Sequence, residues 1–463
     1  MATQTKAYDV IVVGSGSGAT IVENALYQGL SVAWVDRGPL GGTCLNVGCI
    51  PSKILIFPAD RVMEIREASR LGVEATVETI DFAAIMDRMR RMVGHSRDQI
   101  RQSLERDTPD LDFYETEAHF VGHHTLQVDD TRIEGRHIFL VSGARPLIPS
   151  IEGLDEVDYL TNESVLGLTE RPESLIIIGG GYISVEYSHF FAAMGTRVTI
   201  LQRNERLVPE EEPDISRLLE EKLAERMDIY TSAEAVKIEP DEDGCMVVAE
   251  DRSTGEQIDV RAERVMIAAG RRSNADLLQV KNAGIETDEA GYIQVNAYLQ
   301  TNVERIWALG DATGGHMFKH VANREARIAW HNFAHDHQTP MDYSAVPHAV
   351  FSRPQIASVG LTEAQAQAGG EFDILVGEAK YIDVAKGQAM METDGFAKAI
   401  VERSEGKILG FHLIGPYAPI LIQAVVNVMA NDGTVNEVGA GMHIHPALPE
   451  VVVSALYNLR EPR

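Results

Sequence analysis

Residues 41–53 read Gly-Gly-Thr-Cys-Leu-Asn-Val-Gly-Cys-Ile-Pro-Ser-Lys, and the rest of the chain is organised around this stretch. Its two cysteines, Cys44 and Cys49, lie five positions apart. In a regular helix this spacing would separate the two α-carbons by roughly 8–9 Å, whereas a disulfide needs them within about 7 Å. A bond between them therefore requires a distorted turn, which the flanking glycines and Pro51 allow. Because a strained, accessible disulfide is reduced more readily than a relaxed one, the stretch favours a redox-active dithiol.

A zinc site or a purely structural disulfide fits the two cysteines less well. A structural zinc site uses four ligands, and the chain has only one further cysteine, Cys245, in an acidic turn. We therefore expect no metal. A structural disulfide is typical of secreted proteins, and residues 1–9 lack the apolar core of a signal peptide. We expect a cytoplasmic protein, in which a reducing environment favours a catalytic pair.

Length and charge limit the classes of function. The 463 residues suggest about three domains. Asp and Glu number 69 against 41 Lys and Arg, which gives a net charge of −28. Such a charge disfavours nucleic acid and anionic membranes as partners. The many acidic side chains also repel one another unless salt screens their charges, so the sequence suggests a saline cytoplasm.

A dinucleotide-binding pattern precedes the cysteine stretch. Residues 8–13 predict a buried parallel strand, which leads through a small-residue pattern into an amphipathic helix. The pattern is G-x-G-x-x-A, formed by Gly14, Gly16 and Ala19. These residues permit a tight turn, approach of a pyrophosphate and close helix–strand packing. A second predicted strand, 30–35, ends at Asp36, whose carboxylate can accept ribose hydroxyls.

A second nucleotide-binding pattern follows later in the chain. A predicted strand at 174–178 leads into Gly179-Gly180-Gly181, and Ser184 takes the third motif position. The next strand, 197–201, ends in Gln202-Arg203-Asn204-Glu205-Arg206 rather than in an acid. NAD sites usually place a carboxylate there, whereas NADP sites use arginine for the 2′-phosphate. The pattern favours NADPH.

Taken together, these features resemble the class I flavin-dependent pyridine nucleotide–disulfide oxidoreductases, from about residue 9 to residue 459. The resemblance implies an α/β fold with two Rossmann-like nucleotide-binding domains, for FAD and NAD(P), and an α+β C-terminal dimerisation domain. The implied domains are residues 1–150 with 275–342 for FAD, 151–274 for NADPH, and 343–463 for the interface of a homodimer.

The resemblance also implies roles for particular residues. The implied FAD-binding residues are Gly14, Gly16, Ala19, Asp36, Gly42, Thr43, Lys53 and Asp311. The implied NADPH-binding residues are Gly179, Gly181, Tyr182, Arg203, Arg206 and Gly270. Glu186 is expected to pair with Lys53 near the flavin. His445, oriented by Glu450, is expected to cross the dimer interface as the acid–base residue.

In the implied mechanism, electrons pass from NADPH through FAD to Cys49, which opens the disulfide. Cys44 then attacks the substrate disulfide, and His445 of the partner subunit protonates the departing thiolate. Ser17 and Arg327 are the substrate-binding residues that the resemblance suggests, whereas Asn24 departs from the arginine of glutathione reductases.

Several functions remain open within the family. The lack of cysteines after Cys245 argues against mercuric reductase and high-molecular-weight thioredoxin reductase, and the presence of two thiols argues against single-cysteine NADH peroxidases. Residues 319–327 and 445–450 resemble mycothione reductases and their relatives. With the acidic charge, this favours an NADPH-dependent reductase of a bis-γ-glutamylcystine-like disulfide. The alternatives are an NAD-linked dihydrolipoamide dehydrogenase, a mycothione- or glutathione-type reductase, and a non-catalytic flavoprotein within a larger complex.

Overall fold

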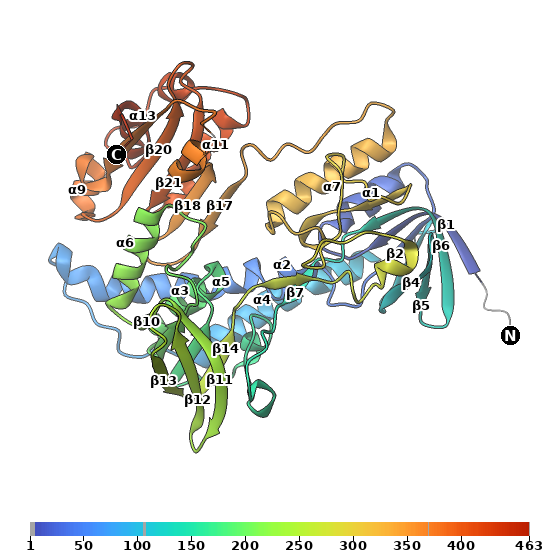
Figure 1. The fold of residues 1–463 in the computed structure, drawn as a ribbon, viewed down its shortest axis with the longest axis horizontal. Helices are drawn as coiled ribbons and strands as arrows, with labels where there is room; N and C mark the ends of the chain where they lie inside the picture. Colours follow the sequence, from blue (N-terminus) through green and yellow to red (C-terminus); the bar gives the residue numbers. More distant parts are fainter. Residues whose placement is uncertain (1–4, 105–107, 369, 463) are drawn as a thin grey trace. The chain divides into compact units, whose positions relative to one another are not determined.

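The computed structural model describes residues 5–104, 108–368 and 370–462, and the chain divides into two compact units (Figure 1). The first unit comprises Met1–Ser52, Asp87–Leu147 and Gly270–Asp342. The second comprises Lys53–Met86, Ile148–Ala269 and Tyr343–Arg463. The three-domain division expected from the sequence groups these segments differently, and it stays a prediction.

The first unit is built on a mixed sheet whose strand order is β3-β2-β1-β6-β5-β4, with β16 also paired to β6. The strands are β1 (Thr5–Val13), β2 (Val32–Val35), β3 (Leu111–Tyr114), β4 (Ala118–Gly122), β5 (Thr125–Val128), β6 (Thr131–Leu140) and β16 (Ile306–Ala308). β1 is parallel to both β2 and β6. Its apolar run is buried on both faces, as expected for a parallel strand inside a sheet. The strand and helix expected after residue 8 are therefore confirmed.

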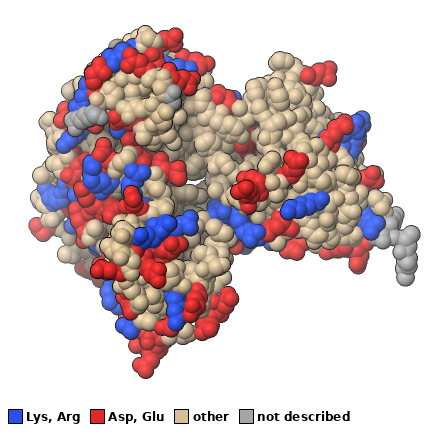
Figure 2. Space-filling model, in the orientation of Figure 1, with Lys and Arg blue, Asp and Glu red and all other residues tan. Residues whose placement is uncertain are grey.

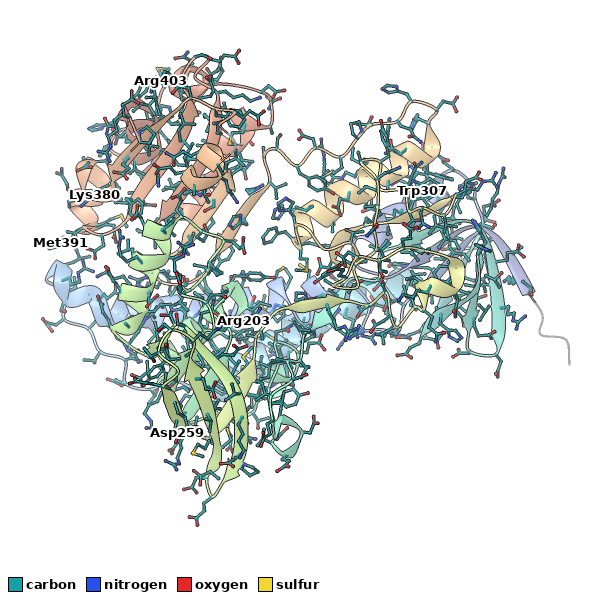
Figure 3. All side chains as sticks on the ribbon, in the orientation of Figure 1. Arg203, Asp259, Trp307, Lys380, Met391 and Arg403 are labelled. Carbon is teal, nitrogen blue, oxygen red and sulfur yellow. The ribbon has the colours of Figure 1, made fainter. Side chains whose placement is uncertain are left out.

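The first unit also contains helices, two of which carry the cysteine stretch. They are α1 (Gly18–Tyr27), α2 (Gly42–Asn46), the start of α3 (Cys49–Glu67), α4 (Phe82–Leu104) and α7 (Lys319–Ala334). Trp307 of β16 (Figure 3) stacks on Phe139 of β6 with ring centroids 5.0 Å apart. Phe333 of α7 meets both rings edge-on. These aromatic contacts fix α7 on the sheet, beside α1.

The second unit contains a smaller parallel sheet in the order β10-β9-β8-β14. Its strands are β8 (Ser174–Ile178), β9 (Arg197–Leu201), β10 (Asp228–Tyr230) and β14 (Arg264–Ile267), with α5 (Tyr182–Met194) and α6 (Pro213–Ala224). The two strands expected at 174–178 and 197–201 have those bounds. An antiparallel sheet of β11 (Ala233–Asp241), β12 (Gly244–Asp251) and β13 (Gln257–Ala262) lies within the same unit.

The last part of the second unit is a six-stranded antiparallel sheet in the order β17-β18-β21-β20-β19-β22. Its strands are β17 (Pro347–Val350), β18 (Ile356–Gly360), β19 (Ile374–Lys380), β20 (Phe396–Glu402), β21 (Ile408–Ile414) and β22 (Leu459–Arg460). Its helices are α8 (Glu363–Ala368), α9 (Ala385–Met390), α10 (Ala418–Leu421), α11 (Gln423–Met429), α12 (Val435–Gly439) and α13 (Pro449–Tyr457). A core that includes Phe411, Leu413 and Val451 packs between the sheet and the later helices.

Among the described residues, one helical stretch, 42–71, is long and apolar enough to cross a membrane by length and composition alone. The core helix of a soluble protein meets the same criterion. This stretch contains the cysteine motif.

Candidate active site

The two cysteines come together where one helix ends and the next begins. Cys44 lies in α2, and Cys49 is the first residue of α3. Val47, with φ −140° and ψ 15°, breaks the helix between them. A Cβ at Gly48 would lie 3.0 Å from the Thr43 carbonyl oxygen and 3.4 Å from the Cys44 Cα. The distorted turn expected from the sequence is therefore present, and a glycine at position 48 gives it room.

No disulfide joins the two cysteines in the structure; Cys44 is half-buried and Cys49 is exposed. The hydrogen bond between the Cys44 and Cys49 side chains, together with burial, raises the pKa of Cys44. The positive charge of Lys319 opposes this rise. Two adjacent thiols lose their protons in two coupled steps, so the pair favours one thiolate with its proton-bearing neighbour.

The first glycine loop fits a bound dinucleotide. Gly14 has φ +112°, and a Cβ there would lie 2.1 Å from the Val141 carbonyl oxygen. The Asp36 carboxylate accepts hydrogen bonds from the backbone N–H groups of Ser15 (2.5 Å) and Gly38 (2.6 Å). Ala19 lies in the first turn of α1. The predicted small-residue turn is thus formed, and Asp36 braces it.

Polar groups without partners lie in the same unit. Among the described residues, Ser142 Oγ and Arg271 Nε are buried and have no hydrogen-bond partner. Arg271 Nη2 lies 3.5 Å from Asp311 Oδ2, and burial raises the pKa of Asp311. Unsatisfied buried polar atoms are costly. A polar ligand such as the pyrophosphate and ribityl chain of FAD would satisfy them.

The expected pair of Lys53 and Glu186 is formed inside the second unit. Lys53 Nζ donates to both carboxylate oxygens of Glu186, at 2.8 and 2.6 Å. Glu186 is buried and also accepts from the Phe351 backbone N–H at 3.0 Å. The ammonium lies 4.6 Å from the centre of the Phe351 ring. Tyr182 is the first residue of the helix that carries Glu186.

The second glycine loop repeats the geometry of the first. Gly179 has φ +122°, and a Cβ there would lie 2.2 Å from the Ala268 carbonyl oxygen. Ser184, the departure from the third glycine, donates its hydroxyl to the Gly179 carbonyl at 2.6 Å. Gly181 is the N-cap of α5. Gly270, expected to belong to the NADPH-binding part, lies in the first unit, where its carbonyl accepts from Leu147.

The loop after β9 begins with Gln202 rather than with an acidic residue, and it carries two arginines, Arg203 and Arg206. Gln202 is buried, and its amide donates to the Arg206 carbonyl at 3.1 Å. A Cβ at Gly180 would lie 2.7 Å from the Gln202 side chain, so the amide closes over the glycine loop. The Arg203 side chain is exposed (Figure 3), and Arg206 donates to the Pro209 carbonyl.

The expected histidine–carboxylate pair is also formed. His445 Nδ1 lies 2.8 Å from Glu450 Oε1, and the second carboxylate oxygen accepts from the Ala447 backbone N–H. These hydrogen bonds lower the pKa of Glu450. The imidazole is 71% exposed. His443 Nε2 instead lies 2.9 Å from the Val438 carbonyl oxygen.

The two substrate-binding residues suggested by the sequence differ in their surroundings. Ser17 is buried, and its hydroxyl donates to Asn323 Oδ1 at 2.9 Å. Arg327 is exposed on α7, and among the described residues no carboxylate pairs with it. Lys319, to which the sequence pattern assigned no role, donates to Ser17 Oγ at 3.1 Å. The one sequence feature that could have pointed to Lys319 was its position at the start of a helix shortly after Asp311.

Family models and known relatives match nearly the whole length of the chain. The family model described as pyridine nucleotide-disulphide oxidoreductase matches residues 8–326, and the dimerisation domain of the same family matches residues 346–456. The chain is 36% identical over 470 residues to mycothione reductase of Mycobacterium tuberculosis (strain ATCC 25618 / H37Rv), covering 98% of this chain and 100% of the relative. It is 32% identical over 476 residues to a dihydrolipoyl dehydrogenase of Bacillus subtilis (strain 168), covering 98% of each.

A solved structure shares the fold. The HOCl-induced flavoprotein disulfide reductase RclA from Escherichia coli matches with a TM-score of 0.86 at 29% identity, covering 97% of this chain and 99% of that chain.

Proposed function

Since the chain belongs to the pyridine nucleotide-disulphide oxidoreductase family, we propose that it is an NADPH-dependent reductase of a low-molecular-weight disulfide. The observation that carries this proposal is the Cys44–Cys49 pair, placed in hydrogen-bond contact by the break between α2 and α3. The family implies a bound flavin and a nicotinamide nucleotide. When bound, the flavin accepts hydride from the nicotinamide and supplies two electrons to the cysteine pair.

The cysteines do the chemistry on the substrate. Cys44 gives up its proton as it attacks one sulfur of the substrate disulfide, which forms a mixed disulfide and releases one thiolate. Cys49 then attacks the Cys44 sulfur, which releases the second thiol and restores the Cys44–Cys49 disulfide. Each turnover consumes two electrons and two protons. Gly48 matters here because the second attack requires the two sulfurs to stay in contact.

His445 of the partner subunit is the proposed acid for the first departing thiolate. The imidazole of His445 is exposed in the single chain and is therefore available to a site on a second chain. The dimerisation domain of the family, which this chain carries, supports such an arrangement. Glu450 holds Nδ1 and leaves Nε2 to carry the proton. We therefore propose a homodimer, located in the cytoplasm.

NADPH is the proposed reductant. Gln202 occupies the position where an NAD site would carry a carboxylate, and its side chain is turned inward to the Arg206 carbonyl. It therefore leaves no acid at the strand end to repel a 2′-phosphate. Arg203 and Arg206 are the proposed partners of that phosphate.

The proposed substrate is a bis-γ-glutamylcystine-like disulfide. Lys319, Asn323 and Arg327 follow at intervals of four residues along α7 and share one side of it. Arg327 lies about 12 Å along the axis from Lys319. An extended γ-glutamylcysteine spans roughly 10 Å from its sulfur to its α-carboxylate. An arginine at this distance suits the distal carboxylate of such an arm.

An assay panel tests the proposal on the FAD-loaded dimer. NADPH and NADH are each tried against cystine, bis-γ-glutamylcystine, glutathione disulfide, mycothione disulfide and lipoamide. We expect activity with NADPH and bis-γ-glutamylcystine, and none in Cys44→Ser or Cys49→Ser. Arg327→Ala should lower kcat/KM for the γ-glutamyl disulfide by a factor that corresponds to ~2–3 kcal/mol of transition-state stabilisation. The kcat/KM for a neutral disulfide should stay nearly unchanged.

The same panel contains the competing outcome. The similarity to dihydrolipoyl dehydrogenase makes NAD-linked oxidation of dihydrolipoamide the second candidate. Preference for NADH and lipoamide would establish that candidate. Disulfide reduction that survives both cysteine substitutions would refute the Cys44–Cys49 chemistry itself.

A further inference from the structure

Lys319 is held at the start of α7 by a three-residue arrangement that we call the Lys319 clasp, formed by Lys319, Ser17 and Asn323. Lys319 Nζ donates to Ser17 Oγ at 3.1 Å, and the same hydroxyl donates to Asn323 Oδ1 at 2.9 Å. Asn323 lies one helical turn after Lys319. Because Ser17 is buried at the start of α1, the clasp fixes the direction of a side chain that is otherwise flexible.

The clasp is joined to the backbone that carries the redox pair. Ser17 directly follows the first glycine loop, and the Ser15 hydroxyl in that loop accepts from the Gly41 backbone N–H at 2.9 Å. A Cβ at Gly42 would lie 2.8 Å from the Gly16 Cα, so the two loops are in backbone contact. Gly42 begins α2, the helix of Cys44. The ammonium of Lys319 is close enough for its charge to act on both cysteines.

The charges around Lys319 favour an anion at the cysteine pair. Among the described residues, no carboxylate lies within 4.0 Å of Lys319, and burial lowers its pKa. Asp311 acts on Lys319 from a greater distance, and its own carboxylate faces Arg271. Lys53, further along α3, is bonded to Glu186. A half-buried ammonium without a carboxylate is costly. Because Asp311 and Glu186 each face another cation, a thiolate on Cys44 or Cys49 is the anion that would balance the charge of Lys319.

We propose that Lys319, positioned by Ser17 and Asn323, is the cation that stabilises the thiolate of the reduced Cys44–Cys49 pair. This inference rests on the proposed function only in taking these cysteines as the redox pair. A nearby lysine favours the thiolate, so the reduced enzyme attacks disulfides at a lower pH than it would without Lys319. Ser17 then acts as a positioning residue for Lys319, a role distinct from the substrate contact suggested by the sequence.

Alkylation of the reduced, FAD-loaded dimer by iodoacetamide measures the thiolate directly and needs no substrate. Rates are recorded from pH 5 to 9 after reduction, with FAD content read from absorbance. For Lys319→Gln we expect the pH profile to move upward and the rate at pH 6.5 to fall about five- to tenfold. Lys319→Arg should restore most of the rate, and Ser17→Ala should shift the profile in the same direction by less.

Lys281→Gln is the matched control, since it removes the same charge from an exposed lysine of the same unit. An unchanged profile in Lys319→Gln, or an equal shift in Lys281→Gln, would overturn the inference. If Lys319→Gln does not retain FAD, Ser17→Ala decides, and a wild-type profile in Ser17→Ala would then overturn the inference. A wild-type enzyme with the expected alkylation profile but no disulfide reductase activity would count against the proposed function alone.

Discussion

At Gly48, the absence of one methyl group allows the two cysteines to meet. A Cβ there would press on the Thr43 carbonyl at 3.0 Å and on the Cys44 Cα at 3.4 Å. Either α2 or the start of α3 would have to move by a few tenths of an ångström. Because the exchange between Cys44 and Cys49 depends on sulfur contact, the position is sensitive in function as well as in stability.

We expect Gly48→Ala to lower the free energy of unfolding by about 1–2 kcal/mol and kcat by about tenfold, since the second sulfur attack loses its alignment. Gly94→Ala in α4 is the control, because a Cβ there meets nothing within 4 Å. It should be neutral or stabilising by up to about 1 kcal/mol. Chemical denaturation and steady-state kinetics measure both variants, and equal behaviour of the two would contradict the argument.

The proposed preference for NADPH also depends on single residues. Arg203→Glu should weaken NADPH binding by ~1.5–3 kcal/mol, because a charge-assisted contact to the 2′-phosphate is replaced by repulsion. Binding of NADH should change much less. Arg261→Glu, in the antiparallel sheet of the same unit, makes the same charge change as a control. Fluorescence titration with both nucleotides measures the effect, and a wild-type preference for NADH would dismiss the idea.

Among the elements, the segment leading into α6 is tied to the C-terminal sheet by a buried ion pair. Glu211 Oε1 lies 2.7 Å from His348 Nε2 of β17, and Ser358 of β18 hydrogen-bonds to the other carboxylate oxygen. Burial opposes charge on both groups, but their hydrogen bond and mutual charge outweigh it. They raise the pKa of His348 and lower the pKa of Glu211.

The sign of the pH dependence follows from these shifts. The contribution of His348 is fully present below its ordinary pKa of 6.5 and is lost as pH rises through the raised value. The contribution of Glu211 is present above its ordinary 4.5 and is lost as pH falls through the lowered value. The pair therefore stabilises the second unit most between these two ordinary values, in mildly acidic solution.

His348→Gln should destabilise the protein by about 2–3 kcal/mol at pH 6, because it leaves the Glu211 charge buried and unpaired. The loss should shrink as pH rises through the raised pKa of His348. His123→Gln, in the exposed turn between β4 and β5, should leave the curve unchanged. Thermal melts from pH 5 to 9 test this, and parallel curves for wild type and His348→Gln would show that the pair does not titrate as described.

At the scale of the whole molecule, the proposed site needs two chains. A dimer of Cys44→Ser chains and a dimer of His445→Gln chains should each be nearly inactive. Co-expressed heterodimers contain one site with both residues intact and should recover about half of the wild-type activity. Tagged chains allow the heterodimer to be isolated. No recovery would mean that Cys44 and His445 act within one chain, and an active His445→Gln dimer would mean that His445 is not the acid.

Net charge is the other property of the whole molecule. The chain carries a net charge of −28, and Asp and Glu side chains are spread widely over the face shown in Figure 2. Screening length falls from ~8 Å at physiological ionic strength to ~3 Å at 1 M salt. Activity and dimer stability should therefore rise with KCl well above 0.15 M. Sedimentation and activity across a salt series measure this, and full stability in dilute buffer would remove the inference of a saline cytoplasm.

The sequence by itself determined the local parts of this protein. The bounds of β8 and β9, both glycine loops and the distorted turn at the cysteines could be read from it, because each depends on residues within a few positions of one another. The alternation of buried and exposed residues and the conformational freedom of glycine both depend on such short stretches of sequence. The Lys53–Glu186 and His445–Glu450 contacts were expected from a family resemblance.

Only the tertiary structure decided which distant side chains share a charge environment. Lys319 and Ser17 are 302 positions apart, and Glu211 and His348 are 137 apart. Their contacts arise because α7 packs beside α1 and because the segment before α6 packs against β17 and β18. The packing of apolar faces chooses those neighbours, and the spacing of polar residues along the chain carries no record of that choice. The clasp beside the cysteines was therefore invisible in the sequence.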